Sequence, residues 1–191
     1  MIEKFLEKNV GNFSHRTYLV YKMQILLLVI IAGVFLKFLI PYELFLIAEL
    51  ILIVILLYEL ATEGREEFKE DFFAYLYFFV GLIIIAQLSW LGPVFAPEFS
   101  GQSFFFFALI ILLFIFMAIF WVVFRRNYGF GKVIMSDGEN CLVETEFDLR
   151  SWTVAKKHNI KSGLKFKKGE RVKLRLKRGL LGPRPVEIEK I

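Results

Sequence analysis

The stretch SFFFFALIILLFIFMAIFWVVF, residues Ser103–Phe124, decides the fold of this chain. It holds 22 residues without a charged side chain. At about 1.5 Å per residue, a helix of this length extends over roughly 33 Å. The hydrocarbon core of a bilayer is about 30 Å thick, so this segment is long enough to cross a membrane. We therefore interpret it as a transmembrane helix.

Three further apolar stretches precede this segment, at about residues 18–40, 44–60 and 72–91. Three residues separate the first two, which predicts a tight antiparallel hairpin. Lys and Arg gather at the N-terminus, between the second and third stretches, and after the fourth, which predicts cytoplasmic termini. Residues 1–10 have an amphipathic pattern that fits either a short interfacial helix or a solvated terminus. We predict a four-span transmembrane domain, a membrane all-α four-helix bundle, over residues 1–126.

Charge and composition divide the chain into two parts with different solvents. The whole chain is 57% hydrophobic, with 23 Phe. Residues 126–191 carry 16 Lys and Arg against 8 Asp and Glu, a net charge of +8. The single Cys141 excludes an internal disulfide, and it lies in an apparent strand where we expect it to be buried. The scarcity of Gln and Asn beside abundant Lys and Glu is typical of a thermophile.

The basic tail changes from helical to strand periodicity. Residues 131–135 and 142–147 read as strands joined by a turn that contains Asp137-Gly138, a hairpin signal. Residues 171–178 alternate strictly between apolar and basic side chains, and residues 186–191 read as a last short strand. Residues 156–168 and 179–185 read as loops. We predict a small all-β cytoplasmic domain, an OB or SH3-like barrel, over residues 127–191.

Polar side chains inside apolar helices are candidates for function, because each is costly in a membrane unless it is paired. Lys37, Glu49 and Gln87 lie at similar predicted depths, in the outer half of the bilayer. They can form one polar cluster. One interpretation is a proton or ion site of a small transporter or channel component, in which Glu49 titrates. The interpretation that we favour is structural: a Lys37–Glu49 pair locks the hairpin, and Gln87 bonds across helices.

The basic strand provides the second candidate site, which is a binding face of Lys173, Arg175, Lys177 and Arg178. Its predicted partners are anionic lipid headgroups, a partner protein, or the acidic segment of residues 59–71, which has a net charge of −4. RNA or the ribosome is a further alternative, because small barrels with a basic face bind RNA. RNA readers stack bases on exposed aromatic rings, and Trp152 is the candidate for that role.

Motifs of enzymes are absent from the sequence. No GxSxG, P-loop or GxGxxG stretch occurs, and neither His15 nor His158 lies in a zinc-binding context. We expect no catalysis, no metal and no cofactor.

Two stretches carry a resemblance to known families: GKVIMSDGENCLVETEFDL at residues 131–149 and KKGERVKLRLKRGLLGPRPVEIEKI at residues 167–191. With the preceding helices, they resemble an uncharacterised archaeal family of predicted membrane proteins. The architecture is also similar to NfeD-like proteins, which end in a small OB-type barrel. That resemblance implies an adaptor that assembles with a stomatin-type membrane scaffold or with itself. We therefore expect a multi-pass cell-membrane protein that presents a basic domain to a partner protein or to anionic headgroups.

Overall fold

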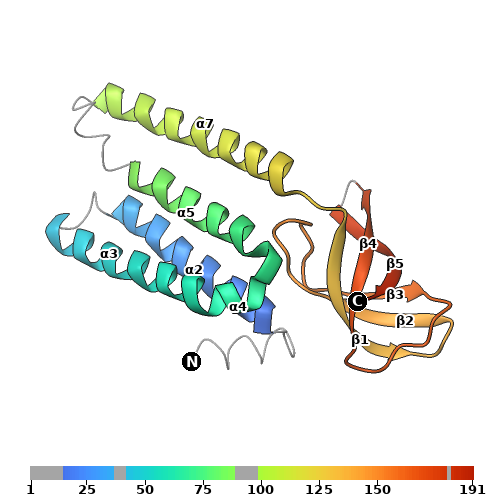
Figure 1. Ribbon diagram of the computed structural model, residues 1–191. Coiled ribbons are helices and arrows are strands. Elements are labelled where there is room, and N and C mark those ends of the chain that lie inside the picture. Colours follow the sequence, from blue (N-terminus) through green and yellow to red (C-terminus); the bar gives the residue numbers. More distant parts are fainter. Residues whose placement is uncertain (1–14, 37–41, 89–98, 180–181) are drawn as a thin grey trace. The chain divides into compact units, whose positions relative to one another are not determined.

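The computed structural model describes residues 15–36, 42–88, 99–179 and 182–191 (Figure 1). The chain divides into two compact units. The helical unit is Tyr21–Val123. The β unit consists of Phe124–Ile191 together with the described part of residues 1–20, which is the first turn and a half of one helix. The predicted boundary between residues 126 and 127 stays a prediction.

Helices occupy most of the first 124 residues, and the apolar stretches of the sequence are helical as expected. The longer helices are α2 (His15–Leu36), α3 (Tyr42–Glu59), α5 (Phe72–Leu88) and α7 (Phe99–Phe124). Between α3 and α5 lie the short helical turns η1 (Leu60–Gly64), α4 (Arg65–Phe68) and η2 (Lys69–Asp71). Residues 1–10, for which an interfacial helix was one prediction, lie outside the described residues.

The expected four-span bundle is wrong. Of the described helices, two are long and apolar enough to cross a membrane: α2, over His15–Gly33, and α7, over Phe104–Phe124. The third predicted span, α5, has 17 residues, and the second, α3, carries three glutamates in 18 residues. The sequence correctly indicates apolar helices at these places, but apolar character alone does not provide the length and neutrality that a span needs.

Aromatic rings hold the helical unit together. Phe68 and Tyr75 stack at a centroid distance of 4.0 Å, and both side chains are buried. Gly81 of α5 lies against Phe116 of α7, and a Cβ atom at residue 81 would come within 2.3 Å of the Phe116 ring. The absent side chain thus permits close packing of the two helices.

The sequence predicts a cytoplasmic loop at the acidic segment of residues 59–71, but the segment is helical. Its composition explains the error, because Glu, Leu, Ala and Arg are good helix formers and the segment contains no proline. Glu59 forms an ion pair with Lys22 at 2.8 Å. The predicted contact between this segment and the basic tail stays a prediction.

The β unit contains one antiparallel sheet with the strand order β3-β2-β1-β4-β5 (Figure 1). The strands are β1 (Tyr128–Ser136), β2 (Asn140–Thr145), β3 (Lys157–Lys161), β4 (Arg171–Gly179) and β5 (Gly182–Lys190). Four of them overlap predicted strands: β1, β2, β4 and, over residues 186–190, β5. The predicted loops at 156–168 and 179–185 are partly wrong, because they contain β3 and the start of β5.

The sheet is an open half-barrel and not the closed barrel that we expected. Its two edge strands, β3 and β5, approach each other, yet they do not pair in the ladder order. The inner face of the sheet and Phe166, from the segment between β3 and β4, form an apolar core. Its members on the strands are Val133, Cys141, Val143, Ile160, Val172, Leu174 and Leu176. Cys141 is fully buried, as predicted, and burial raises the pKa of its thiol. The thiol is therefore protonated at neutral pH.

The turn between β1 and β2 depends on Asp137, and this gives a first testable prediction. The carboxylate of Asp137 accepts hydrogen bonds from the backbone N–H groups of Asn140 and Glu139, and these bonds lower its pKa from 3.8. The stabilisation is therefore fully present above pH 3.8 and is lost as the pH falls through the lowered pKa of the folded state. We expect Asp137→Ala to lower the urea midpoint of the β unit at pH 7, measured by hydrogen exchange.

Asp137→Asn is the matched control for this turn. Its side-chain oxygen can still accept both hydrogen bonds, but it does not titrate. The Asn variant should have a urea midpoint at pH 7 close to that of the wild type. Its midpoint should no longer show the part of the decline at acidic pH that comes from protonation of Asp137. Equal midpoints for the Ala variant and the wild type would contradict the proposed role of the carboxylate.

Candidate functional site

The predicted basic face of β4 is in part neutralised by its neighbour β5. Lys173 lies opposite Glu189, and Arg175 lies opposite Glu187. Both pairs form ion pairs, at 3.6 Å and 3.1 Å. These two cations therefore stabilise the β4–β5 ladder, and the charge that they offer to a partner is reduced. These ion pairs could not be predicted from the sequence of β4 alone, because Glu187 and Glu189 lie on β5.

The other half of the predicted face brings cations close to one another. Lys177 lies directly opposite Arg184, so a cation faces a cation across the ladder. Arg178 comes next along β4 and is exposed; slight desolvation lowers its pKa, and the nearby charge of Arg125 lowers it further. We call Arg125, Lys177, Arg178 and Arg184 the hairpin cations. Arg184 and Arg125 belong to this surface but were missing from the predicted face.

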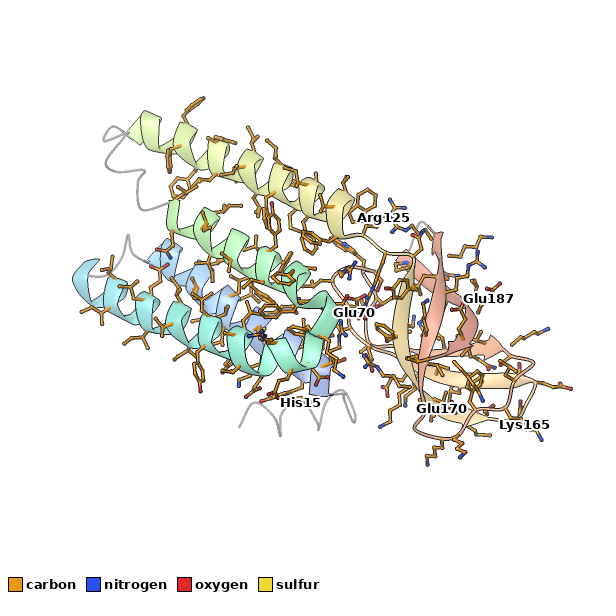
Figure 2. All side chains as sticks on the ribbon, viewed as in Figure 1. His15, Glu70, Arg125, Lys165, Glu170 and Glu187 are labelled. Atoms are coloured by element: carbon orange, nitrogen blue, oxygen red, sulfur yellow. The ribbon has the colours of Figure 1, made fainter. Side chains whose placement is uncertain are left out.

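The hairpin cations lie at one end of the β unit. Figure 2 shows Arg125 there, at the end of α7, and shows Lys165 and Glu170 at the opposite end of the unit. Like charges placed directly opposite each other on two strands destabilise a sheet. A surface that tolerates such a pair is a candidate for binding anions, because a bound anion removes the repulsion.

A buried ion pair lies where the chain leaves α7. The guanidinium of Arg126 donates two hydrogen bonds to Oδ2 of Asp148, from Nε at 3.1 Å and from a terminal nitrogen at 2.9 Å. Both side chains are almost fully buried. The rings of Tyr128 and Phe130 flank the Arg126 guanidinium, with centroids 4.7 Å and 4.9 Å away. The pair is thus satisfied on several sides, as a buried charge must be.

Asp148 also shapes the loop that carries Trp152. Its carboxylate accepts hydrogen bonds from the backbone N–H groups of Arg150 and Ser151, and its backbone pairs with that of Thr153. Trp152 lies inside this loop with φ of +58°, a left-handed conformation that is unusual for a residue other than glycine. Trp152 is half exposed, whereas Phe166 is in the core; the stacking role of Trp152 stays a prediction.

Two members of the predicted intramembrane cluster do meet. The amide of Gln87 donates a hydrogen bond to Oε1 of Glu49 at 2.6 Å, joining α5 to α3, and Glu49 is buried. Lys37 lies outside the described residues. The bond is the cross-helix contact that the structural interpretation expected. Whether Glu49 titrates in a transport cycle stays a prediction.

Residues that could bind a metal do not gather in the part of the chain that the structure describes. No group of three or more His, Cys, Asp and Glu side chains is arranged to hold an ion there. His158 lies on β3, opposite Val143 of β2. His15 lies at the first residue of α2 and is exposed.

Comparison with known proteins identifies the family. No curated protein and no solved structure matches the chain. One family model, described as "Predicted membrane protein (DUF2101)", matches residues 2–189. This match agrees with the expected family of predicted membrane proteins, while the NfeD-like architecture and the archaeal origin stay expectations. The match covers nearly the whole chain, and the protein therefore belongs to this family of predicted membrane proteins.

Proposed function

We propose that this protein is a membrane-anchored binding module, in which apolar helices hold the β unit at a membrane surface and the hairpin cations bind anionic lipid headgroups. The observation that carries the proposal is the cationic surface itself. Lys177 and Arg184 face each other on adjacent strands, beside Arg178 and Arg125. Arg125 also directly follows the last residue of α7, so chain connectivity keeps it close to the end of that helix.

The surface of α7 supports the anchoring part of the proposal. Only 6% of the most apolar stretch of α7 is buried inside the protein. Large side chains such as Phe104, Phe114 and Val122 are more than 70% exposed. A helix that is apolar on all sides and mostly uncovered by protein requires an apolar solvent, and a bilayer provides one.

Electrostatics supports the headgroup part of the proposal. Each Lys or Arg close to an anionic leaflet contributes about 1 kcal/mol. Four hairpin cations would together contribute about 4 kcal/mol, which is enough to hold a domain that is already tethered. The tandem Arg125 and Arg126 after α7 favour the cytoplasmic side for the β unit, since cytoplasmic flanks of membrane helices are rich in Lys and Arg.

The full chain in lipid nanodiscs tests this proposal. One set of nanodiscs contains only a zwitterionic lipid, and the other contains a third of an anionic lipid. We expect the amides of residues 175–179 and 182–186 to exchange hydrogen more slowly in the anionic nanodiscs. This protection should decline in high salt, because surface interactions are screened over about 8 Å at physiological salt and over less at higher salt.

Two double variants distinguish an effect of the hairpin cations from an effect of net charge alone. Lys177→Gln with Arg178→Gln should abolish most of the protection by anionic lipid. The control Lys165→Gln with Lys168→Gln removes the same charge from exposed positions of another loop and should retain it. Equal protection in both kinds of nanodisc, or equal loss in both variants, would overturn the headgroup proposal.

A further inference from the structure

A cavity of about 240 Å³ opens in the β unit, between the loop that carries Trp152 and the two edge strands. It exists because the half-barrel does not close between β3 and β5. Its lining includes Thr145, Trp152, Lys156, His158, Arg184 and Pro185. They come from β2, β3, β5 and the intervening loop, so the sheet brings together segments that are far apart in sequence.

The lining of this cavity is positively charged. Lys156, His158 and Arg184 contribute side chains, and no acidic residue is among the lining residues. Burial lowers the pKa of His158, and the charges of Lys156 and Arg184 lower it further. An anion in the cavity would be attracted by both cations and would relieve their effect on His158.

The cavity also offers a flat apolar surface. Trp152 keeps its indole half exposed at the rim, and Pro183 and Pro185 add rigid rings from β5. The left-handed backbone at Trp152 costs on the order of 1–3 kcal/mol, and such strain persists only where the surroundings enforce it. In the loop that carries Trp152, the hydrogen bond from Ser151 to Asp148 and the backbone pairing of Asp148 with Thr153 fix this left-handed conformation.

We propose that this cavity binds a phosphorylated nucleotide unit, with the base against the indole of Trp152 and the phosphate beside Lys156 and Arg184. Aromatic rings stack on any base, and Lys and Arg bind phosphate, so the two chemistries of the lining match the two parts of this ligand. The inference goes beyond the headgroup proposal, since it concerns another ligand and a cavity that shares only Arg184 with the hairpin cations.

The size of the cavity limits the ligand. Pockets for drug-sized molecules measure about 300–1,000 Å³, so a cavity of about 240 Å³ has room for one nucleotide unit at a time. That unit can be a free mononucleotide or one residue of a single-stranded nucleic acid. Both share the base and the phosphate, and the experiment distinguishes them.

Nuclear magnetic resonance on the full chain in detergent micelles tests the proposal. The chain has two histidines, so labelling of His allows the signals of His158 to be followed with His15 as the internal reference. The probes are adenosine monophosphate, adenosine, inorganic phosphate and a short oligoadenylate. We expect adenosine monophosphate to shift the signals of His158, to raise its pKa, and to bind at least tenfold more tightly than inorganic phosphate.

Two substitutions assign the parts of the site. Trp152→Gly removes the indole and places the residue that best tolerates a φ of +58°, so the loop should keep its shape. We expect this variant to bind adenosine monophosphate at least tenfold more weakly and inorganic phosphate as before. Lys156→Gln should weaken the binding of both, whereas the control Lys165→Gln, an exposed lysine outside the cavity lining, should change neither.

The outcomes decide the proposal. Binding of the oligoadenylate that is much tighter per chain than that of the mononucleotide identifies a nucleic acid as the source of the ligand, and equal binding identifies a free nucleotide. Either result supports the site. A lack of response of His158 to every probe, equal affinity for adenosine monophosphate and inorganic phosphate, or an unchanged affinity in Trp152→Gly overturns it. None of these results depends on Lys177 or Arg178, so the headgroup proposal stands or falls separately.

Discussion

Asp148→Ala should lower the free energy of unfolding of the β unit by about 3–5 kcal/mol, because it removes one partner of a buried ion pair and the acceptor of two hydrogen bonds from the Arg126 guanidinium. Arg126 and Asp148 are almost fully buried, and the Asp148 carboxylate accepts two hydrogen bonds from the Arg126 guanidinium. The loss of the backbone bonds from Arg150 and Ser151 adds to this cost, since these N–H groups lose an acceptor. Urea-dependent hydrogen exchange of β1 and β4 in the full chain measures the effect.

A double substitution tests whether Asp148→Ala is costly because it removes one charge of the buried pair and keeps the other. Arg126→Met with Asp148→Leu removes both ions, and pairs replaced in this way commonly cost less than either single change. We therefore expect the double variant to be more stable than Asp148→Ala. Glu187→Ala is a control for a surface pair, because Glu187 and Arg175 are both exposed, and such a pair contributes about 0–1 kcal/mol. A loss in Asp148→Ala as small as that in Glu187→Ala would refute the account.

The strands that alternation predicted are the ones with a buried face and a solvated face. In β4, Val172, Leu174 and Leu176 point into the core and the residues between them do not, which is the pattern that sequence reading detects best. In contrast, β3 contains a single apolar side chain in its core position, Ile160, so its alternation is too weak to detect. The start of β5 was missed because of Pro183 and Pro185. Proline is tolerated there because β5 is an edge strand.

The candidate sites could be predicted only as far as single strands allow. The basic run on β4 was visible, but the register with β5 was needed to place Lys173 and Arg175 opposite glutamates and Lys177 opposite Arg184. The cavity beside Trp152 could not be predicted at all. It requires the curvature that brings β5 close to β3, and no local pattern encodes that approach.

Gly131→Ala should also destabilise the β unit strongly. Gly131 lies on β1, the central strand, where it pairs with both Thr145 and Val172. A Cβ atom at this position would lie 2.7 Å from a methyl group of Val143 and 2.8 Å from the carbonyl oxygen of Glu144. Overpacking of this kind costs about 1–3 kcal/mol. Because one of the close atoms belongs to the backbone, we expect a loss near the upper end of this range in the same urea experiment.

Gly163→Ala is the matched control, since nothing lies within 4 Å of the added Cβ atom and the residue is exposed. Removing a glycine from an unstrained position stabilises by about 0.4–1 kcal/mol, because it restricts the unfolded chain. The two substitutions add the same methyl group, so the difference between them isolates packing against Val143 and Leu174 from backbone entropy. If both variants unfold at the same urea concentration, the close approach of Val143 and Leu174 to residue 131 is not the reason why this position requires glycine.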